Sequence, residues 1–269
     1  MFLTRLLTVA IALPMFAAAL LLLPPLAWAL FLLPGLFIAG WEWGGLAGYR
    51  ASVRALFAVL ITASAFALAY LIPSVPGTLA PVDAGAYAAS CVFWVLVAPW
   101  WLRMRWRTRN AVLLAVTGWI ALVPMWLALV RLQADAWALL LFLSIVWIAD
   151  TAAYCAGKGW GRRKLAPDIS PGKSWEGVMG AAAVLGIYYV VLWFIVPPTD
   201  RYFHFWAGAV LVAVLFALSI EGDLFESWLK RQAGKKDSGN LLPGHGGVLD
   251  RIDGLTATLP MAALVFYYY

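Results

Sequence analysis

Long apolar runs occupy most of this 269-residue chain, and their number and spacing restrict its fold more than any other feature. Nine runs are long enough, or nearly so, to cross the roughly 30 Å hydrocarbon core of a bilayer as helices. With 64% hydrophobic and 12% charged residues, the composition also favours a polytopic membrane protein over a soluble domain. We therefore predict an all-α membrane protein with nine spans, at 6–23, 26–43, 54–72, 84–102, 111–130, 136–156, 177–196, 205–222 and 254–269.

The basic residues test this count independently, because Lys and Arg are retained on the cytoplasmic side of a membrane. With the N-terminus in the cytoplasm, nine spans place seventeen of the nineteen basic residues on that side and the C-terminus outside. Only Arg131 and Arg201 fall on the outer side, and an even number of spans would scramble the partition. The inner residues are Arg5, Arg50, Arg54, Arg103, Arg105, Arg107, Arg109, Lys158, Arg162, Arg163, Lys164, Lys173, Lys230, Arg231, Lys235, Lys236 and Arg251.

The domain organisation follows from the same pattern. The sequence contains no internal repeat and no soluble segment, so we expect one membrane-embedded domain over residues 1–269. Residues 1–135 hold the first five predicted spans, and residues 136–269 form a catalytic half with inner loops 157–176 and 223–253. The outer loops carry few polar groups, which assigns any chemistry to the cytoplasmic side.

The first of these inner loops combines glycines with basic side chains. Gly157, Gly159 and Gly161 occupy every second position at the start of this loop, and the stretch S-P-G-K-S follows at 170–174. Flexible backbone N–H groups, hydroxyls and an ammonium group favour phosphate binding, without a Walker sequence. Turn formation explains this loop equally well, so the loop alone leaves a phosphate role open. Asp150 and Glu42 are carboxylates within apolar runs, where a lone charge is unfavourable. Helix capping or pairing with an arginine would explain each of them equally well, so both stay unassigned.

The second inner loop places carboxylates at the ends of two spans. If the eighth span continues as a helix, Asp223, Glu226 and Ser227 share a face, because they are three and four residues apart. Asp250 and Asp253 repeat this spacing at the start of the ninth span. Clustered carboxylates repel one another unless they are protonated or bridged by cations, and hard oxygen ligands select Mg²⁺ or a similar ion. We therefore predict a metal site where the two spans meet.

Basic residues and glycines separate the two carboxylate groups. Lys230, Arg231, Lys235 and Lys236 follow the eighth span, and the glycines around His245 would let the backbone approach an anion closely. Simpler roles account for each residue alone: a topological signal, a salt bridge between a lysine and the glutamate four residues before it, or an aspartate cap at a helix start. Their co-occurrence on one side, in a chain with almost no other polar material, favours a metal-dependent phosphate site.

The segment from Ser227 to Asp253 resembles the signature of the phosphatidate cytidylyltransferases, also called CDP-diacylglycerol synthases. Its pattern is S-x-L-K-R, four residues, then K-D-x-G-x-x-L-P-x-H-G-G-V-x-D-R-I-D. The upstream D-T-A-A-Y, the stretch K-L-A-P-D-I-S-P-G-K-S-W-E-G and the tryptophan-flanked Glu42 are also similar to the bacterial members. The resemblance is strong over about the last 130 residues and mainly one of topology over the first 140.

This resemblance implies a Mg²⁺-dependent nucleotidyltransferase that converts CTP and phosphatidate into CDP-diacylglycerol and pyrophosphate for phospholipid biosynthesis. The metal ligands it implies are Asp223 and Asp250 for the principal ion, with Asp253 and Glu226 supporting a second cation. The implied catalytic set is Asp223, Asp250, Lys236 and His245, and the implied substrate-binding set is Ser170, Pro171, Lys173, Glu176, Lys230, Arg231, Gly246, Gly247 and Arg251. We expect Ser170 to Glu176 on the nucleotide side, and Lys230, Arg231 and Lys236 on the lipid phosphate.

The implied partners are CTP, phosphatidate and the lipid bilayer; nucleic acid is not expected, and a homodimer stays open. The implied location is the bacterial inner membrane, with a multi-pass chain whose active site faces the cytoplasm. Two alternative functions stay open. A CTP-dependent polyprenol or phytol kinase would share the basic inner loops and Mg²⁺, whereas a secondary transporter would place ionisable residues at the bilayer midplane in paired broken helices.

Overall fold

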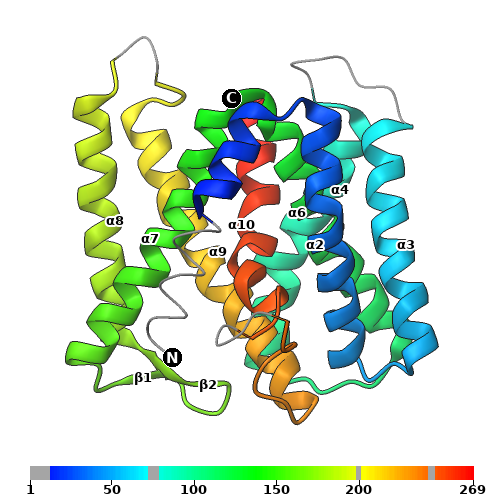
Figure 1. Cartoon of the computed structure of the whole chain (residues 1–269). Coiled ribbons are helices and arrows are strands. Elements are labelled where there is room, and N and C mark those ends of the chain that lie inside the picture. Colours follow the sequence, from blue (N-terminus) through cyan, green and yellow to red (C-terminus); the bar gives the residue numbers. More distant parts are fainter. Residues whose placement is uncertain (1–12, 72–78, 198–200, 242–245) are drawn as a thin grey trace.

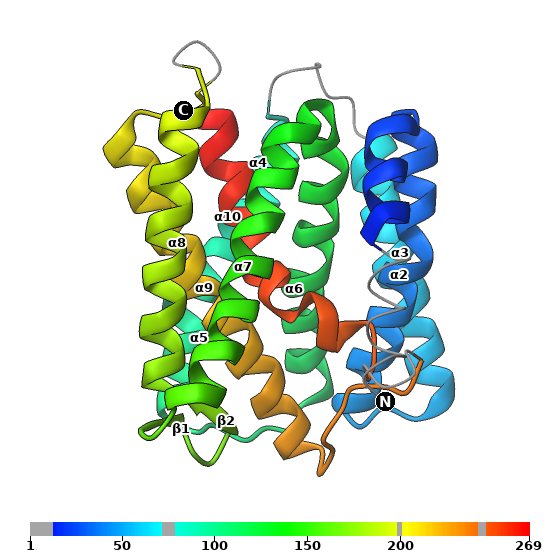
Figure 2. The same ribbon diagram turned by 60° about the vertical axis from the view of Figure 1, so that its left-hand side comes forward.

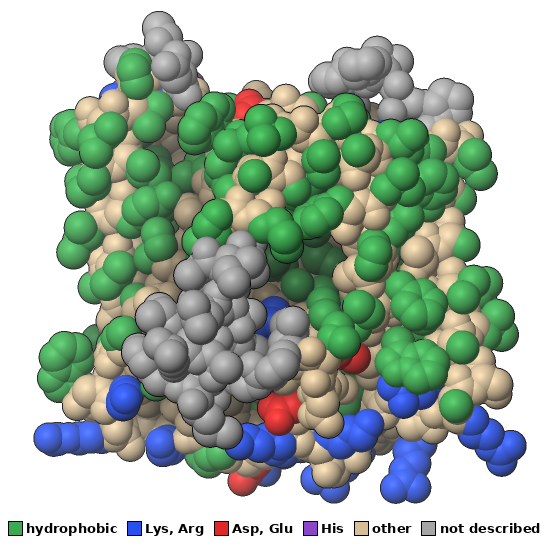
Figure 3. Space-filling model, in the orientation of Figure 1, with side chains coloured by type: hydrophobic (Ala, Val, Ile, Leu, Met, Phe, Trp, Pro, Cys, Tyr) green, Lys and Arg blue, Asp and Glu red, His purple; other side chains and the backbone are tan. Residues whose placement is uncertain are grey.

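The computed structural model describes residues 13–71, 79–197, 201–241 and 246–269. They form a bundle of helices that run between two ends, and a two-stranded hairpin, residues 164–174, covers one of these ends (Figure 1). Lys and Arg side chains gather at the end that holds the hairpin, which we call the basic end, and hydrophobic side chains cover the sides (Figure 3). The C-terminal end of the chain lies at the opposite end (Figure 1).

The N-terminal helices pack as antiparallel neighbours. A short helix, Leu13–Leu22, precedes α2 (Pro25–Leu46), and α3 (Ala51–Tyr70) returns beside α2. Next, α4 (Pro81–Val92) continues through a π-helical turn, η1 (Phe93–Val97), into α5 (Ala98–Arg103). Prolines begin α2 and α4, at positions where the missing N–H removes no helical hydrogen bond. The π turn ends two residues before Pro99, a proline that does remove a helical hydrogen bond, and helices adjust locally at such residues.

The longest helical stretch folds back on itself at a short 3₁₀ turn. It consists of α6 (Ala111–Arg131), η2 (Leu132–Asp135) and α7 (Ala136–Trp160). Helices α6 and α7 both run between the two ends of the bundle (Figure 2), and α10 (Leu249–Tyr268) packs against both of them. Asn110 caps α6 by accepting a hydrogen bond from the Leu113 N–H at 3.1 Å, and Asp135 caps α7 through the Ala138 N–H at 3.0 Å. Side-chain caps therefore define where both helices begin.

The hairpin follows α7 and leads into the last three helices. Strands β1 (Lys164–Ala166) and β2 (Ser170–Ser174) pair antiparallel, with Lys164 opposite Ser174 and Ala166 opposite Ser170. Then come α8 (Trp175–Ile195), α9 (Phe205–Gln232) and α10 (Leu249–Tyr268). The hairpin corrects the all-α prediction, although helices make up nearly all of the remaining structure. Ala166 and Ser170 both precede a proline, and that position disfavours helical backbone.

The core lies where α6 and α10 run through the bundle. Most residues of α6 and half of those of α10 are buried, and α10 packs against α9, α6 and α4. The Trp43 indole of α2 donates a hydrogen bond to the Leu114 carbonyl of α6 at 2.8 Å. Gly118 makes room for that indole, because a Cβ there would overlap it. By contrast, α8 exposes most of its apolar side chains, which is expected of a helix that faces lipid.

Six helical stretches in the described residues are long and apolar enough to cross a membrane. One of them, Ala111–Trp160, has 50 residues, or about 75 Å of helix, and its fold at η2 makes it two crossings. A further helix, α10, falls outside the six because charged residues occupy its first turns. A multi-pass membrane protein is therefore the right class, while the count of nine and the side of each terminus stay predictions. The first predicted span, 6–23, lies partly outside the described residues.

Candidate active site at the basic end

The C-terminal part of α9 carries the first group of site residues. This helix continues to Gln232, ten residues beyond the predicted end of the eighth span, and so places Asp223, Glu226 and Lys230 on consecutive turns. The Lys230 ammonium lies 2.5 Å from Glu226 Oε2 and 2.7 Å from Asp250 Oδ1. These side chains are largely buried, with 12% of Lys230, 4% of Glu226 and 6% of Asp250 exposed. A buried cation thus joins the end of α9 to the start of α10.

The Asp250 carboxylate is held by donors on every side. Oδ1 accepts from Lys230, while Oδ2 accepts from the Ser238 N–H and the Ser238 hydroxyl, both at 2.9 Å, and from the Gly247 N–H at 2.8 Å. Gly246 has a positive φ of 80°, and a Cβ there would approach Asp250 Oδ2 to 2.6 Å. The glycines next to α10 therefore let the loop wrap around this carboxylate. Such a set of donors fixes the orientation of Asp250.

The N-terminus of α10 is capped by a residue from the other half of the chain. Its N-cap residue is Val248, which has no side-chain acceptor. Glu42 of α2 supplies one instead: its carboxylate accepts from the Val248 N–H at 3.2 Å, the Leu249 N–H at 2.8 Å and the Ser238 hydroxyl at 3.0 Å. Glu42 is 3% exposed, so these bonds satisfy a charge that would otherwise be buried alone. The negative carboxylate also suits the positive end of the helix dipole.

The two carboxylate-bearing helices approach closely at Gly222. A Cβ at this position would overlap the Asp253 carbonyl, so only glycine lets α9 and α10 come this near. Asp253 accepts the Gly254 N–H at 2.8 Å and lies within electrostatic range of Asp223 and Glu226. The acidic residues of both helices therefore form one cluster.

The hairpin brings the other inner loop to the same cluster. Lys173 of β2 lies 2.6 Å from Asp223 Oδ2, and Asp223 Oδ1 accepts the Ser227 hydroxyl at 3.3 Å. On the same helix, Arg231 donates from Nε to the Ile169 carbonyl at 3.1 Å, which fastens the hairpin turn to α9. Both inner loops singled out in the sequence thus meet at one place.

The other predicted site residues surround this cluster. Ser170 is half-buried at the start of β2, and Pro171 beside it is exposed. The Glu176 carboxylate accepts the backbone N–H groups of Arg162 and Arg163, at 3.0 and 3.1 Å, and so binds within its own loop. Arg251 is exposed and lies within electrostatic range of Asp150, and Lys236 is exposed as well. His245 lies outside the described residues.

Comparison with known proteins decides how this cluster is interpreted. The sequence profile of the cytidylyltransferase family matches residues 3–269. The chain belongs to the cytidylyltransferase family.

Individual members of this family are similar over different lengths. A phosphatidate cytidylyltransferase of Pseudomonas aeruginosa is 39% identical over 282 aligned residues, which cover 98% of this chain and 96% of that protein. One from Haemophilus influenzae is 39% identical over 60% of this chain and 59% of its own length. One from Brucella suis is 49% identical over 46% of this chain and 44% of its own length. The similarity to the Pseudomonas aeruginosa protein therefore extends over nearly the whole chain.

For a cytidylyltransferase, the acidic cluster has the donors that a divalent cation requires. No three His, Cys, Asp or Glu side chains among the described residues form a ready-made metal site. Mg²⁺, however, is usually bound by one or two carboxylates together with substrate phosphates and water. Asp223 and Asp250 offer two such carboxylates, each now paired with a lysine, and Glu226 Oε1 is a buried acceptor without a hydrogen-bond partner in the described structure. The residues present fit a hard cation.

Sequence reasoning missed Glu42 and Ser238 as parts of this site. Their contact joins residues 196 positions apart, and no spacing within a helix or loop predicts such a pair. One signal was present, since Glu42 is a carboxylate inside an apolar run, where burial without partners is unfavourable. The sequence marked Glu42 as unusual, but only the packing of α2 against the loop identifies its partners.

Proposed function

We propose that this chain is a phosphatidate cytidylyltransferase, which transfers a cytidylyl group from CTP to phosphatidate and releases pyrophosphate. Membership in the family and the names of its similar relatives support this function. The observation that carries it to particular residues is the network in which the buried Lys230 joins Glu226 to Asp250 and the partly buried Lys173 pairs with Asp223. Alternating cations and carboxylates at one end of the bundle suit a reaction between two polyanionic substrates.

The reaction exchanges one phosphorus–oxygen bond for another. An oxygen of the phosphatidate phosphate attacks the α-phosphorus of CTP, and the bond from that phosphorus to the bridging oxygen breaks, so that pyrophosphate leaves with the electron pair. The nucleophile is already anionic near neutral pH, and no general base is required. Positioning and charge neutralisation therefore do most of the catalysis. We assign Lys173 to the triphosphate and Lys230 to keeping Asp250 in place.

In this proposal Asp223 and Asp250 would hold Mg²⁺, with Asp253 and Glu226 as supporting acceptors. The ion would neutralise charge on the transferring phosphoryl group and on the pyrophosphate. Ser238, Gly247 and Lys230 orient Asp250 for that task through the bonds described above. Such orientation of a ligand by its neighbours is a common requirement of metal sites.

We also propose nine membrane spans with the basic end in the cytoplasm of a bacterial inner membrane. The concentration of Lys and Arg side chains at that end supports this orientation, because such residues are retained on the inner side (Figure 3). The position of the C-terminal end of the chain at the opposite end fits an odd number of spans that begins inside (Figure 1). CTP would then reach the cluster from the cytoplasm and phosphatidate from the bilayer.

Incubating the purified chain with labelled CTP, Mg²⁺ and phosphatidate tests this function. We expect a lipid-soluble cytidine product together with pyrophosphate, and we expect a chelator of Mg²⁺ to stop the reaction. Release of CDP with phosphorylation of an alcohol lipid would instead identify a lipid kinase. Substrate flux into vesicles without consumption of CTP would identify a transporter.

Replacing Lys173 by alanine is expected to raise the KM for CTP by roughly 10- to 100-fold and to change the KM for phosphatidate much less. The physical reason is the loss of an ammonium group that we place on the triphosphate. Lys164→Ala, an exposed lysine on the neighbouring strand, is the matched control and should leave both constants unchanged. A larger change for phosphatidate than for CTP would reverse the assignment of the two loops.

A further inference from the structure

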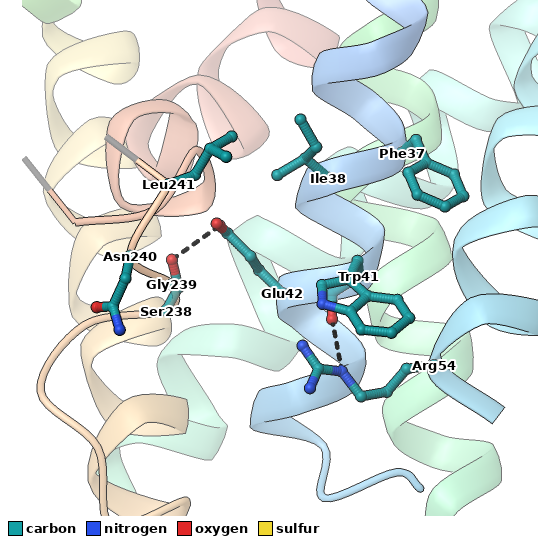
Figure 4. A pocket seen from close by; sticks show the side chains of 9 residues that line it. All are labelled: Phe37, Ile38, Trp41, Glu42, Arg54, Ser238, Gly239, Asn240 and Leu241. Atoms are coloured by element: carbon teal, nitrogen blue, oxygen red, sulfur yellow. Dashed lines mark hydrogen bonds between the residues drawn. The ribbon is translucent and has the colours of Figure 1, made fainter. Parts of the chain in front are cut away.

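An open pocket of about 670 Å³ lies between α2, the start of α3 and the loop that leads to α10 (Figure 4). This volume is within the range of small-molecule sites in proteins. Three segments line it: Phe37, Ile38, Trp41 and Glu42 from α2, Arg54 from α3, and Ser238, Gly239, Asn240 and Leu241 from the loop.

The pocket is apolar at one end and cationic at the other. Phe37, Ile38 and Leu241 lie toward the middle of the bundle, and Arg54 lies at the first turn of α3, nearer the basic end (Figure 4). A lipid placed at a membrane interface has the same division, with its phosphate at the surface and its acyl chains toward the bilayer centre. Trp41 lies at the boundary, where tryptophan is common in membrane proteins.

The guanidinium group of Arg54 is held in a fixed orientation. Its Nε donates to the Trp41 carbonyl at 3.1 Å, and its carbon lies 4.3 Å from the centre of the Trp41 ring. No carboxylate in the described ranges lies within ion-pair distance of Arg54. The pocket therefore contains a pre-oriented cation, and no carboxylate among the described residues forms an ion pair with it.

The wall opposite Arg54 leads directly to the acidic cluster. Ser238 lines the pocket, and its hydroxyl contacts both Glu42 and Asp250, at 3.0 and 2.9 Å. A phosphate held by Arg54 would therefore share the pocket with Ser238, the residue that contacts Asp250. Two of the cations first expected on the lipid phosphate are engaged elsewhere, since Lys230 joins two carboxylates and Arg231 donates to a backbone carbonyl.

We propose that this pocket holds the glycerol-phosphate end and the first acyl segments of phosphatidate, with Arg54 as the residue that recognises its phosphate. The inference rests on the proposed function and names a lipid subsite within it. CTP does not suit the pocket, because its apolar end would face a polar nucleotide. Arg54 acts here through a charge-assisted hydrogen bond to the phosphate, the contact that distinguishes an anionic lipid from a neutral one.

Kinetics with each substrate varied separately test the proposal. In mixed micelles, Arg54→Gln should raise the KM for phosphatidate roughly 10- to 100-fold and leave the KM for CTP nearly unchanged. Arg54→Lys should restore part of the difference, because it keeps the charge without the planar fork. Arg50→Gln is the control: it removes the same charge from an exposed residue that does not line the pocket, and should change neither constant.

A second variant and a binding measurement keep the result independent of folding. Leu241→Trp should also raise the KM for phosphatidate. Leu241 is 55% exposed, so the position has room for a larger side chain, and that side chain would fill the apolar end of the pocket. Native mass spectrometry without CTP should show that the unmodified protein retains phosphatidate over phosphatidylcholine and that Arg54→Gln loses this preference. Unchanged kinetics and binding, or an equal rise in the KM for CTP, would overturn the subsite. An unmodified protein that makes no CDP-diacylglycerol would overturn the proposed function instead.

Discussion

Replacing Asp250 by asparagine is expected to lower CTP-dependent formation of the lipid product about a thousandfold or more. The change keeps the size of the side chain but removes its charge. It also puts an NH₂ group where Oδ1 accepts from Lys230 or where Oδ2 accepts three other hydrogen bonds. The cluster would lose a ligand for Mg²⁺ and the partner of a buried ammonium. Initial rates with labelled CTP and saturating phosphatidate measure the effect.

A matched control separates this effect from a general loss of surface charge. Asp168 is a carboxylate that lies at the same end of the molecule, in the hairpin turn, where it pairs with Arg105 and is 58% exposed. Asp168→Asn should therefore retain nearly full activity, since exposed ion pairs contribute little. Both variants should insert into membranes and elute as the unmodified protein does. Normal activity of Asp250→Asn would refute the assignment of Asp250 to the active site.

Replacing Glu42 by alanine is expected to give the second-largest loss, although Glu42 lies in the N-terminal half of the chain. Three buried donors, the Val248 and Leu249 N–H groups and the Ser238 hydroxyl, would lose this acceptor. Leaving a buried group without its partner costs about 1–3 kcal/mol. We expect a lower melting temperature and a loss of activity of roughly 10- to 100-fold, because the loop that holds Asp250 would loosen.

Thermodynamic coupling distinguishes this positioning role from a purely structural one. Glu42→Gln and Ser238→Ala should each lower activity, and the double variant should lose much less than the product of the two, because both act on Asp250 through one hydrogen-bond network. The KM for Mg²⁺ should rise in parallel in all three. Asp168→Asn, whose exposed carboxylate lies outside this network and outside the pocket, is again the control and should retain activity. Fully additive losses with an unchanged Mg²⁺ requirement would contradict the role of Glu42.

The predicted helices agree with the structure where apolar length alone decides the element. The spans predicted at 111–130 and 136–156 correspond to α6 and α7, and side-chain caps at Asn110 and Asp135 fix where each begins. Helix α9 is longer than predicted, because Asp223, Glu226 and Lys230 end the apolar run but not the helix. Hydropathy reports lipid contact, whereas helix length depends on backbone hydrogen bonds, which charged residues also allow.

The site residues also divide into those that local sequence spacing predicted and those that it did not. The spacing of Asp223 and Glu226 predicted a shared helix face, and α9 provides it. The pairing of Lys173 with Asp223 was not predictable, because it joins a hairpin to a helix. Pocket residues such as Arg54 were interpreted only as topological charge, since nothing near them in the sequence indicates a ligand.

By itself, the sequence determined that this chain folds as membrane-spanning helices, and it predicted that two loops on the inner side carry the chemistry. Apolar runs and charge asymmetry are properties of single segments in a bilayer and need no knowledge of their neighbours. Only the tertiary structure decided that Glu42 caps α10, that Ser238 links it to Asp250 and that Arg54 faces the pocket beside them. These contacts depend on how α2 and α3 pack against a loop nearly 200 residues later in the chain, and that packing is set by the shape of the whole bundle.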